Sequence, residues 1–150
     1  MSMTTYASVT DVTQWFADEL DGNSWSVKFT ASRYYLPLTA LKDISVAKVC
    51  VYPSEITTTP RSHSEMVDEV DIIIKVYARV TLGTLATQDS YLKLVEEIRD
   101  HFLHPDTTPP SGIAWEGSNM LLTIDTDLMN EDNLFSATLT FPMTCVRTVT

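Results

Sequence analysis

The feature that most constrains the fold is a regular alternation of apolar and polar residues between Asp71 and Val80. One side of this segment, taken as extended chain, carries Ile72, Ile74, Val76, Ala78 and Val80, and the other carries Asp71, Lys75, Tyr77 and Arg79. Successive side chains of a β-strand point to opposite faces of a sheet, so the alternation predicts a strand with one buried face. A buried face requires a second layer of structure packed against it.

Six other segments have the spacing of regular structure. Strands are predicted at residues 25–35, 41–52, 120–127 and 134–146. Pro53 is expected to end the second of these strands, because proline cannot donate a backbone hydrogen bond. Helices are predicted from a capping box formed by Ser8 and Asp11, and over residues 87–103 with Asp89 as the N-cap.

The order of these elements predicts an α+β fold. A helix is followed by three strands, a second helix and two strands, which suits a mainly antiparallel sheet of about five strands with the two helices packed on one face. The other face would then be open, or covered by something outside the chain. No repeat, low-complexity stretch or linker divides the sequence, so residues 1–150 are expected to form a single domain.

Charge and hydropathy exclude several classes of partner. The formal net charge of −10 argues against nucleic acid as an affinity partner, since such binding depends on Lys and Arg neutralising phosphates. Apolar runs such as Ile72-Ile73-Ile74 fall far short of the ~20 residues that a membrane helix needs, so no membrane is expected. Without an apolar leader at the amino terminus, we expect synthesis in the cytosol, where Cys50 and Cys145 would stay reduced.

No segment carries a complete catalytic or cofactor motif. The four glycines are too widely spaced for a phosphate-binding loop, and no G-x-S-x-G sequence is present. The carboxylate run Glu65, Asp68, Glu69 and Asp71 is interpreted as a solvated acidic surface. We therefore expect no enzyme activity, no catalytic residues and no cofactor.

Two patterns faintly suggest metal binding. His101 and His104 could share a helix face and hold an ion with Asp100 or Asp106, although a structural zinc site needs four ligands. Residues 125–132 weakly resemble a calcium loop, but Asn130 stands where that loop requires glycine. A solvated helix end and a solvated strand end are the preferred interpretations, with no metal.

Several segments together resemble small virion proteins of tailed bacteriophages. The similar stretches, in chain order, are ASRYYLPL at 31–38, LKDI at 41–44, AKVCVYP at 47–53, TPR at 59–61, YLKLVEEIRDHF at 91–102 and NLFSATLT at 133–140. The resemblance covers most of the chain, and it is a pattern of strands, helices and turns without a chemical signature. The sequence departs from the family habit in its acidic balance and at Leu38.

This resemblance implies a tail terminator or head–tail joining (neck) protein. Such proteins form a homo-oligomeric ring, commonly of six copies, at the head-proximal end of the tail tube, where they stop tube polymerisation and join the tail to the head connector. The implied location is the virion, after assembly in the host cytoplasm. DNA would pass through the ring without specific binding. Another neck or head-completion protein remains an alternative, as does a non-viral monomeric protein-binding module.

Residues 55–65 (EITTTPRSHSE) are the candidate interface. They have no apolar periodicity and contain Pro60, so they are predicted to form a long loop or an extended arm. In a ring protein such an arm would reach a neighbouring subunit or the tube, with Arg61 paired to a carboxylate of the partner. The candidate interface residues are Thr57, Thr58, Thr59, Pro60, Arg61, Ser62 and His63.

Overall fold

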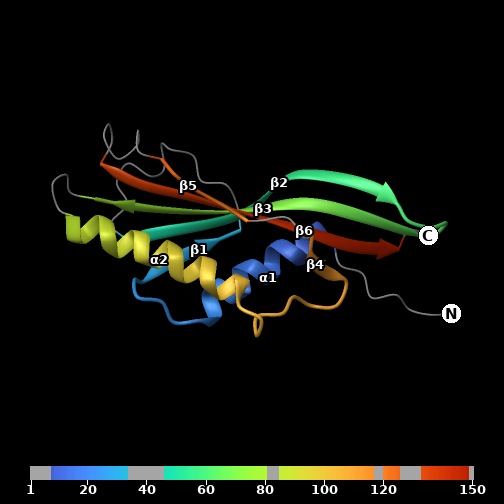
Figure 1. Cartoon of the computed structure of the whole chain (residues 1–150), viewed down its shortest axis with the longest axis horizontal. Coiled ribbons are helices and arrows are strands. Elements are labelled where there is room, and N and C mark those ends of the chain that lie inside the picture. Colours follow the sequence, from blue (N-terminus) through green and yellow to red (C-terminus); the bar gives the residue numbers. More distant parts are fainter. Residues whose placement is uncertain (1–7, 34–45, 81–84, 117–119, 126–132, 149–150) are drawn as a thin grey trace.

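The computed structural model describes residues 8–33, 46–80, 85–116, 120–125 and 133–148, which form two helices and one mixed six-stranded sheet (Figure 1). The elements in chain order are α1 (Val9–Gly22), β1 (Phe29–Ser32), β2 (Ala47–Pro60), β3 (Glu65–Arg79), α2 (Leu85–Leu103), β4 (Ile113–Trp115), β5 (Leu121–Ile124) and β6 (Leu134–Thr148). The predicted α+β fold is confirmed. The segments around Leu38 and at 126–132 lie outside the described residues.

The sheet is built around three long strands. Its order is β1-β2-β3-β6-β4, and β5 also pairs with β6. Only the β1–β2 pair is parallel; the other pairs are antiparallel. β6 runs along the whole of β3, from Glu65 opposite Thr148 to Arg79 opposite Leu134.

Both helices cover one face of this sheet, as predicted (Figure 1). The side chains of β3 that point to the helices are those of the alternating apolar set, and Ile72, Ile74 and Val76 are fully buried. The rings of Phe16, Phe102 and Phe141 meet where α1, α2 and β6 converge, with centroids 4.6 to 5.5 Å apart. Aromatic pairs at this spacing add to the stability that burial gives.

Local sequence signals predicted the first residue of α1 correctly, but not that of α2. α1 begins with the predicted capping box: the Asp11 N–H donates to Ser8 Oγ at 3.2 Å, and the Ser8 N–H donates to Asp11 Oδ2 at 2.9 Å. The assignment of Asp89 as the N-cap of α2 is wrong, because α2 already begins at Leu85 and Asp89 lies inside it. No helix among the described residues has the length and apolar character to cross a membrane.

Several strands differ from the prediction. β1 begins at Phe29 and not at residue 25, β3 begins at Glu65 and not at Asp71, and β4 was not predicted. Pro53 does not end β2, which continues to Pro60 past an irregularity in the register between Pro53 and Ile56. Proline is tolerated there because this part of β2 is a sheet edge, where a missing N–H breaks no ladder. Residues 55–65 therefore do not form a loop. They are the end of β2, a short turn and the first residue of β3.

The face opposite the helices is partly closed within the chain. Cys50, Tyr77 and Leu134 are 0 to 4% exposed and form a small cluster with Tyr52. The expectation that this face would be open, or covered only by another molecule, is wrong at this end of the sheet. The two cysteines lie on opposite faces, since Cys145 belongs to the main core and Cys50 to this smaller cluster.

Candidate interaction surface

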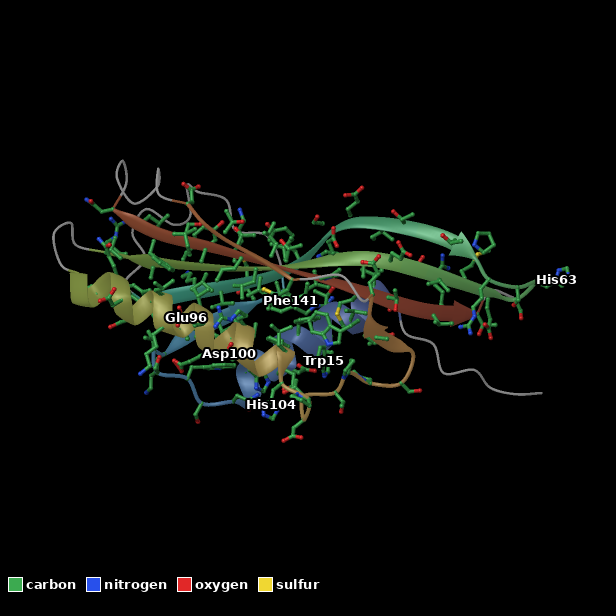
Figure 2. All side chains as sticks on the ribbon, viewed as in Figure 1. Trp15, His63, Glu96, Asp100, His104 and Phe141 are labelled. Carbon is green, nitrogen blue, oxygen red and sulfur yellow. The ribbon has the colours of Figure 1, made fainter. Side chains whose placement is uncertain are left out.

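The β2–β3 hairpin projects beyond the helices as an arm, defined here as residues 53–70 (Figure 1). Every residue from 53 to 64 is exposed. His63 lies at the tip of the arm, far from the core residues Trp15 and Phe141 (Figure 2). The predicted protrusion is thus present, in the form of a strand pair.

The structure places the seven predicted interface residues in two parts of the arm. Thr57, Thr58, Thr59 and Pro60 are the last residues of β2, and Arg61, Ser62 and His63 belong to the turn. The turn is closed by the N–H groups of Arg61 and Ser62, which donate to the carbonyl of Glu65 at 2.9 and 3.2 Å. Threonine is β-branched and favours strands, which fits the Thr57–Thr59 run in β2.

A buried carboxylate fastens the arm to β6. Asp68 of β3 is 4% exposed. Its Oδ1 accepts a hydrogen bond from Thr58 Oγ1 at 2.6 Å, and its Oδ2 accepts one from Arg147 Nε at 2.7 Å. One side chain therefore joins all three strands of the arm region, and both of its oxygens are satisfied.

These contacts set the pKa of Asp68. Burial by itself raises the pKa of the carboxyl group, but the hydrogen bonds from Thr58 and Arg147 and the charge of Arg147 outweigh burial, so the pKa lies below its ordinary value of 3.8. Beside it, Cys145 is fully buried. Burial, together with the negative charges of Asp68 and Asp11, raises the pKa of that thiol to about 12. Cys145 is thus held as an unreactive thiol.

Arg61, at the tip of the arm, makes only a weak ion pair among the described residues of the chain. The Arg61 side chain is 60% exposed, and its Nε lies 3.7 Å from Glu65 Oε2. An exposed ion pair at this separation contributes little to stability. The proposed pairing of Arg61 with a carboxylate of another molecule stays a prediction.

The two histidines of the possible metal site have different surroundings. His101 Nε2 lies 2.8 Å from Glu19 Oε2 of α1, and its ring meets Trp25 edge-on with centroids 5.4 Å apart. His104 Nδ1 is 3.7 Å from Asp106 Oδ2, and its side chain is 59% exposed. His101 therefore contributes to α1–α2 packing, whereas His104 belongs to the surface.

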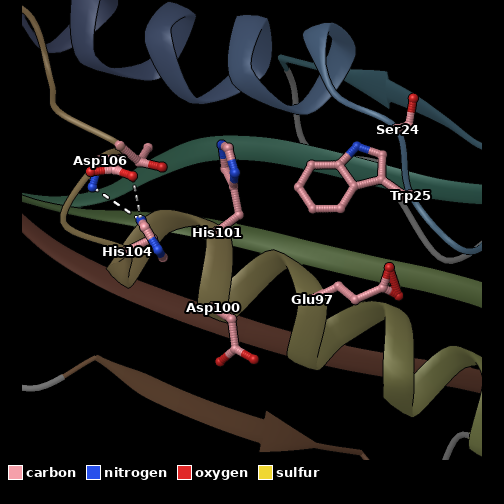
Figure 3. Close-up of a pocket in the computed structure, with 8 residues that line it drawn as sticks. Ser24, Trp25, Glu97, Asp100, His101, His104 and Asp106 are labelled. Atoms are coloured by element: carbon pink, nitrogen blue, oxygen red, sulfur yellow. Dashed lines mark hydrogen bonds and ion pairs between the residues drawn. The ribbon is translucent and has the colours of Figure 1, made fainter.

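Both histidines line an open cleft of about 530 Å³ at the carboxyl end of α2 (Figure 3). Its lining consists of Ser24, Trp25, Glu97, Asp100, His101, His104, Asp106 and Thr107. Asp100 and His101 project from different sides of α2 in Figure 3. In the part of the chain that the structure describes, no three His, Cys, Asp or Glu side chains are placed to hold a metal ion.

The two other acidic patterns, at 125–132 and in β3, do not form a metal site among the described residues. Of the calcium-like segment, only Asp125 is described, and its N–H donates to the Ser136 carbonyl at 2.9 Å. The alternation of β3 separates Asp68, which points to the helix-covered face, from Glu69 and Asp71 on the other face. Glu69 and Asp71 line one open hollow together with Glu55 and Glu116.

The Thr58–Asp68–Arg147 cluster was missed by the sequence reasoning. Asp68 was grouped with its acidic neighbours, and Arg147, 79 residues away, had no signal that linked it to Asp68. The alternation of β3, extended back to Glu65, would have placed Asp68 on the inner face. A carboxylate at an inner position would then have required a partner.

No family model matches the chain, and no curated protein aligns with it significantly.

Proposed function

We propose that this chain is a structural subunit of a bacteriophage neck, which forms a homo-oligomeric ring of six copies at the head-proximal end of the tail tube. The ring would stop tube polymerisation and join the tail to the head connector. The observation that carries the proposal is the arm, an ordered strand pair whose residues 53–64 are all exposed. The resemblance of the sequence to tail terminators supplies the biological setting.

The arm has the physical properties of a preformed contact surface. In the arm, β2 pairs with β3, and β3 pairs with β6. This pairing fixes the backbone of the arm, so little conformational entropy is lost when the arm binds a partner. Residues 56–60 (ITTTP) carry no charge, and Ile56 is 51% exposed. An uncharged edge strand with an exposed aliphatic side chain favours pairing with another chain.

The acidic composition suits a ring through which DNA passes. Six copies at −10 each would carry a formal charge of about −60. A surface of this sign repels phosphates and disfavours adsorption of the DNA. The same charge makes the copies repel one another, which favours contacts between them that are apolar or backbone-mediated, or that pair Arg61 with a carboxylate.

Native mass tests the proposal. We expect light scattering after size-exclusion chromatography to give a closed oligomer for the wild-type chain, either in solution or on isolated tail tubes. Ile56→Asp should lower the assembled fraction at least tenfold, because it places a carboxylate on the arm without touching the core. Val46→Asp is the matched control, since Val46 is 48% exposed and immediately precedes the other end of β2.

Three results would contradict the proposal or part of it. A chain that is monomeric in solution and on tail tubes is a binding module and forms no ring. A ring that binds the head connector but not the tube is another neck or head-completion protein. Equal loss of assembly in the Ile56 and Val46 variants would show that the arm has no special part in the contact.

A further inference from the structure

The arm edge of β2 and the outer edge of β4 lie at the same level on opposite sides of the sheet. Following the register across the strands, Ile56 is opposite Val70, Val70 is opposite Met143, and Met143 is opposite Trp115. Two residues further along β2, Thr58 is opposite Asp68, Asp68 is opposite Cys145, and Cys145 is opposite Ile113. The sheet therefore ends, row by row, in Ile56 and Thr58 on one side and in Trp115 and Ile113 on the other.

The unpaired backbone groups of β2 follow from the turn. The Arg61 N–H donates to the Glu65 carbonyl, so Arg61 faces β3. Because backbone groups of successive residues in a strand point to opposite sides, Thr59 and Thr57 also face β3. Ile56 and Thr58 consequently direct their N–H and C=O groups away from the sheet, at an edge where no described strand pairs with them.

The unpaired groups of β4 follow in the same way. The Val146 N–H donates to the Gly112 carbonyl at 2.9 Å and the Glu116 N–H to the Pro142 carbonyl at 3.1 Å, so these residues of the β4 segment face β6. Ile113 and Trp115 then face outward. The Ile113 N–H already donates to Pro110 at 3.1 Å. Three backbone groups at this edge therefore have no hydrogen bond among the described contacts: the C=O of Ile113, and the N–H and C=O of Trp115.

We infer that the arm edge of β2 in one copy pairs with β4 of the next copy, which continues the sheet from subunit to subunit; this inference rests on the proposed ring. β2 is antiparallel to β3, β3 to β6 and β6 to β4, so β2 and β4 run in opposite directions. A neighbour related by rotation presents its β2 antiparallel to β4. Pairing of two different edges is head-to-tail, and such pairing gives a ring when the rotation between copies closes, whereas β2 with β2 would stop at a dimer.

The donors and acceptors of the two edges match in the register that continues each row. With Ile56 opposite Trp115, the two residues exchange both backbone hydrogen bonds, and the Thr58 N–H donates to the Ile113 carbonyl. The Thr58 carbonyl is left to water, because the Ile113 N–H is already used. The contact thus has three backbone hydrogen bonds.

The side chains support the same register. Ile56, 51% exposed, lies on the helix-covered face, as does the half-buried Trp115, so each would cover apolar surface of the other. The opposite face brings Glu55 near Glu116 of the next copy, and both side chains are exposed. Like charges across an edge repel, so raising the salt concentration should strengthen assembly by screening.

Engineered cysteines test the pairing directly. In the proposed register Thr57 lies opposite Ala114 of the next copy, with Cα atoms about 4.5 Å apart, which is within disulfide range. Both residues are exposed on the face away from the helices, so their replacement should not disturb the fold. Within one chain they are separated by three strand spacings, about 14 Å, too far for a disulfide.

The expected result is a covalent ladder that ends at the copy number of the ring. Oxidised glutathione should link the Thr57→Cys/Ala114→Cys double variant into this ladder on a non-reducing gel, and an equal mixture of the two single variants should give dimers only. Each single variant alone should stay unlinked, as should the wild-type chain, whose Cys50 and Cys145 are buried. Thr57→Cys/Thr123→Cys is the matched control, because Thr123 is an exposed residue of β5.

The other outcomes separate this inference from the proposed function. A ring of normal mass without the ladder refutes the edge pairing and leaves the ring proposal intact. Linking of Thr57→Cys alone would show that β2 pairs with β2, and linking through Thr123 would show that β5 is the partner strand. Monomers in every variant and in the wild type would refute both the ring and the pairing.

Discussion

Asp68→Asn should reveal how much of the chain's stability depends on the fastening of the arm. The substitution keeps the shape of the side chain and removes its charge, so the Arg147 guanidinium loses a charge-assisted hydrogen bond made at 2.7 Å. Breaking a fully buried ion pair costs about 3–5 kcal/mol. The Arg147 side chain is 38% exposed and can be hydrated, so the expected loss is nearer to about 1.5–3 kcal/mol, the value for hydrogen bonds to charged groups.

Urea unfolding followed by tryptophan fluorescence measures this loss. Glu69→Gln is the matched control, since it removes the neighbouring carboxylate on the exposed face of the same strand and should change stability by less than about 0.5 kcal/mol. Arg147→Met, combined with Asp68→Asn, completes a double-mutant cycle. The double variant should lose less than the sum of the two single losses, because each removes the same contact.

The loss should also depend on pH in a defined direction. The pKa of Asp68 is lowered in the folded chain, so its contribution is fully present above the unfolded pKa of about 3.9 and disappears as pH falls through the folded value. The difference between wild type and Asp68→Asn should stay constant from pH 7 to about pH 5 and shrink below about pH 4. A difference equal to that of Glu69→Gln, or one that does not change with pH, would refute this account of the cluster.

Three further predictions concern the core, the histidines and the buried thiol. Ile74→Ala and Ile98→Ala should each lower the free energy of unfolding by about 2–5 kcal/mol, since both side chains are fully buried; losses below about 0.5 kcal/mol would contradict this. His101→Ala should lower the free energy of unfolding by about 1 kcal/mol, because it removes the contact with Glu19. His104→Ala should leave the free energy of unfolding unchanged, and equal losses in the two variants would refute this distinction. Cys145, with a pKa of about 12, should react with a thiol reagent at pH 8 only after unfolding; rapid labelling of the native chain would show that it is accessible.

The sequence by itself was enough to predict elements in which one side is clearly more apolar than the other. The alternation at Ile72, Ile74 and Val76 identified β3, because that face packs against the helices, whereas the other face carries polar residues as well as the buried Tyr77. The start of α1 was equally local, since the capping box of Ser8 and Asp11 lies within four residues. Such signals need no knowledge of the rest of the chain.

The arm was predicted only in part. Its exposure followed from the polar sequence at 55–65, but its strand structure did not. Both faces of β2 are exposed there, so no apolar alternation marks residues 56–60, and their backbone is fixed instead by pairing with β3. Three consecutive threonines favour a strand, whereas Pro60 and the missing apolar periodicity are typical of a loop.

Only the tertiary structure decided which residues meet across the sheet. Arg147 reaches Asp68 because β6 lies beside β3 in one particular register, and a shift of one residue would turn Arg147 to the other face. The level of β4 relative to the arm edge depends on the same register, which places Trp115 in the row of Ile56. A register is the sum of many weak contacts between segments far apart in the chain, and no short stretch of sequence contains it.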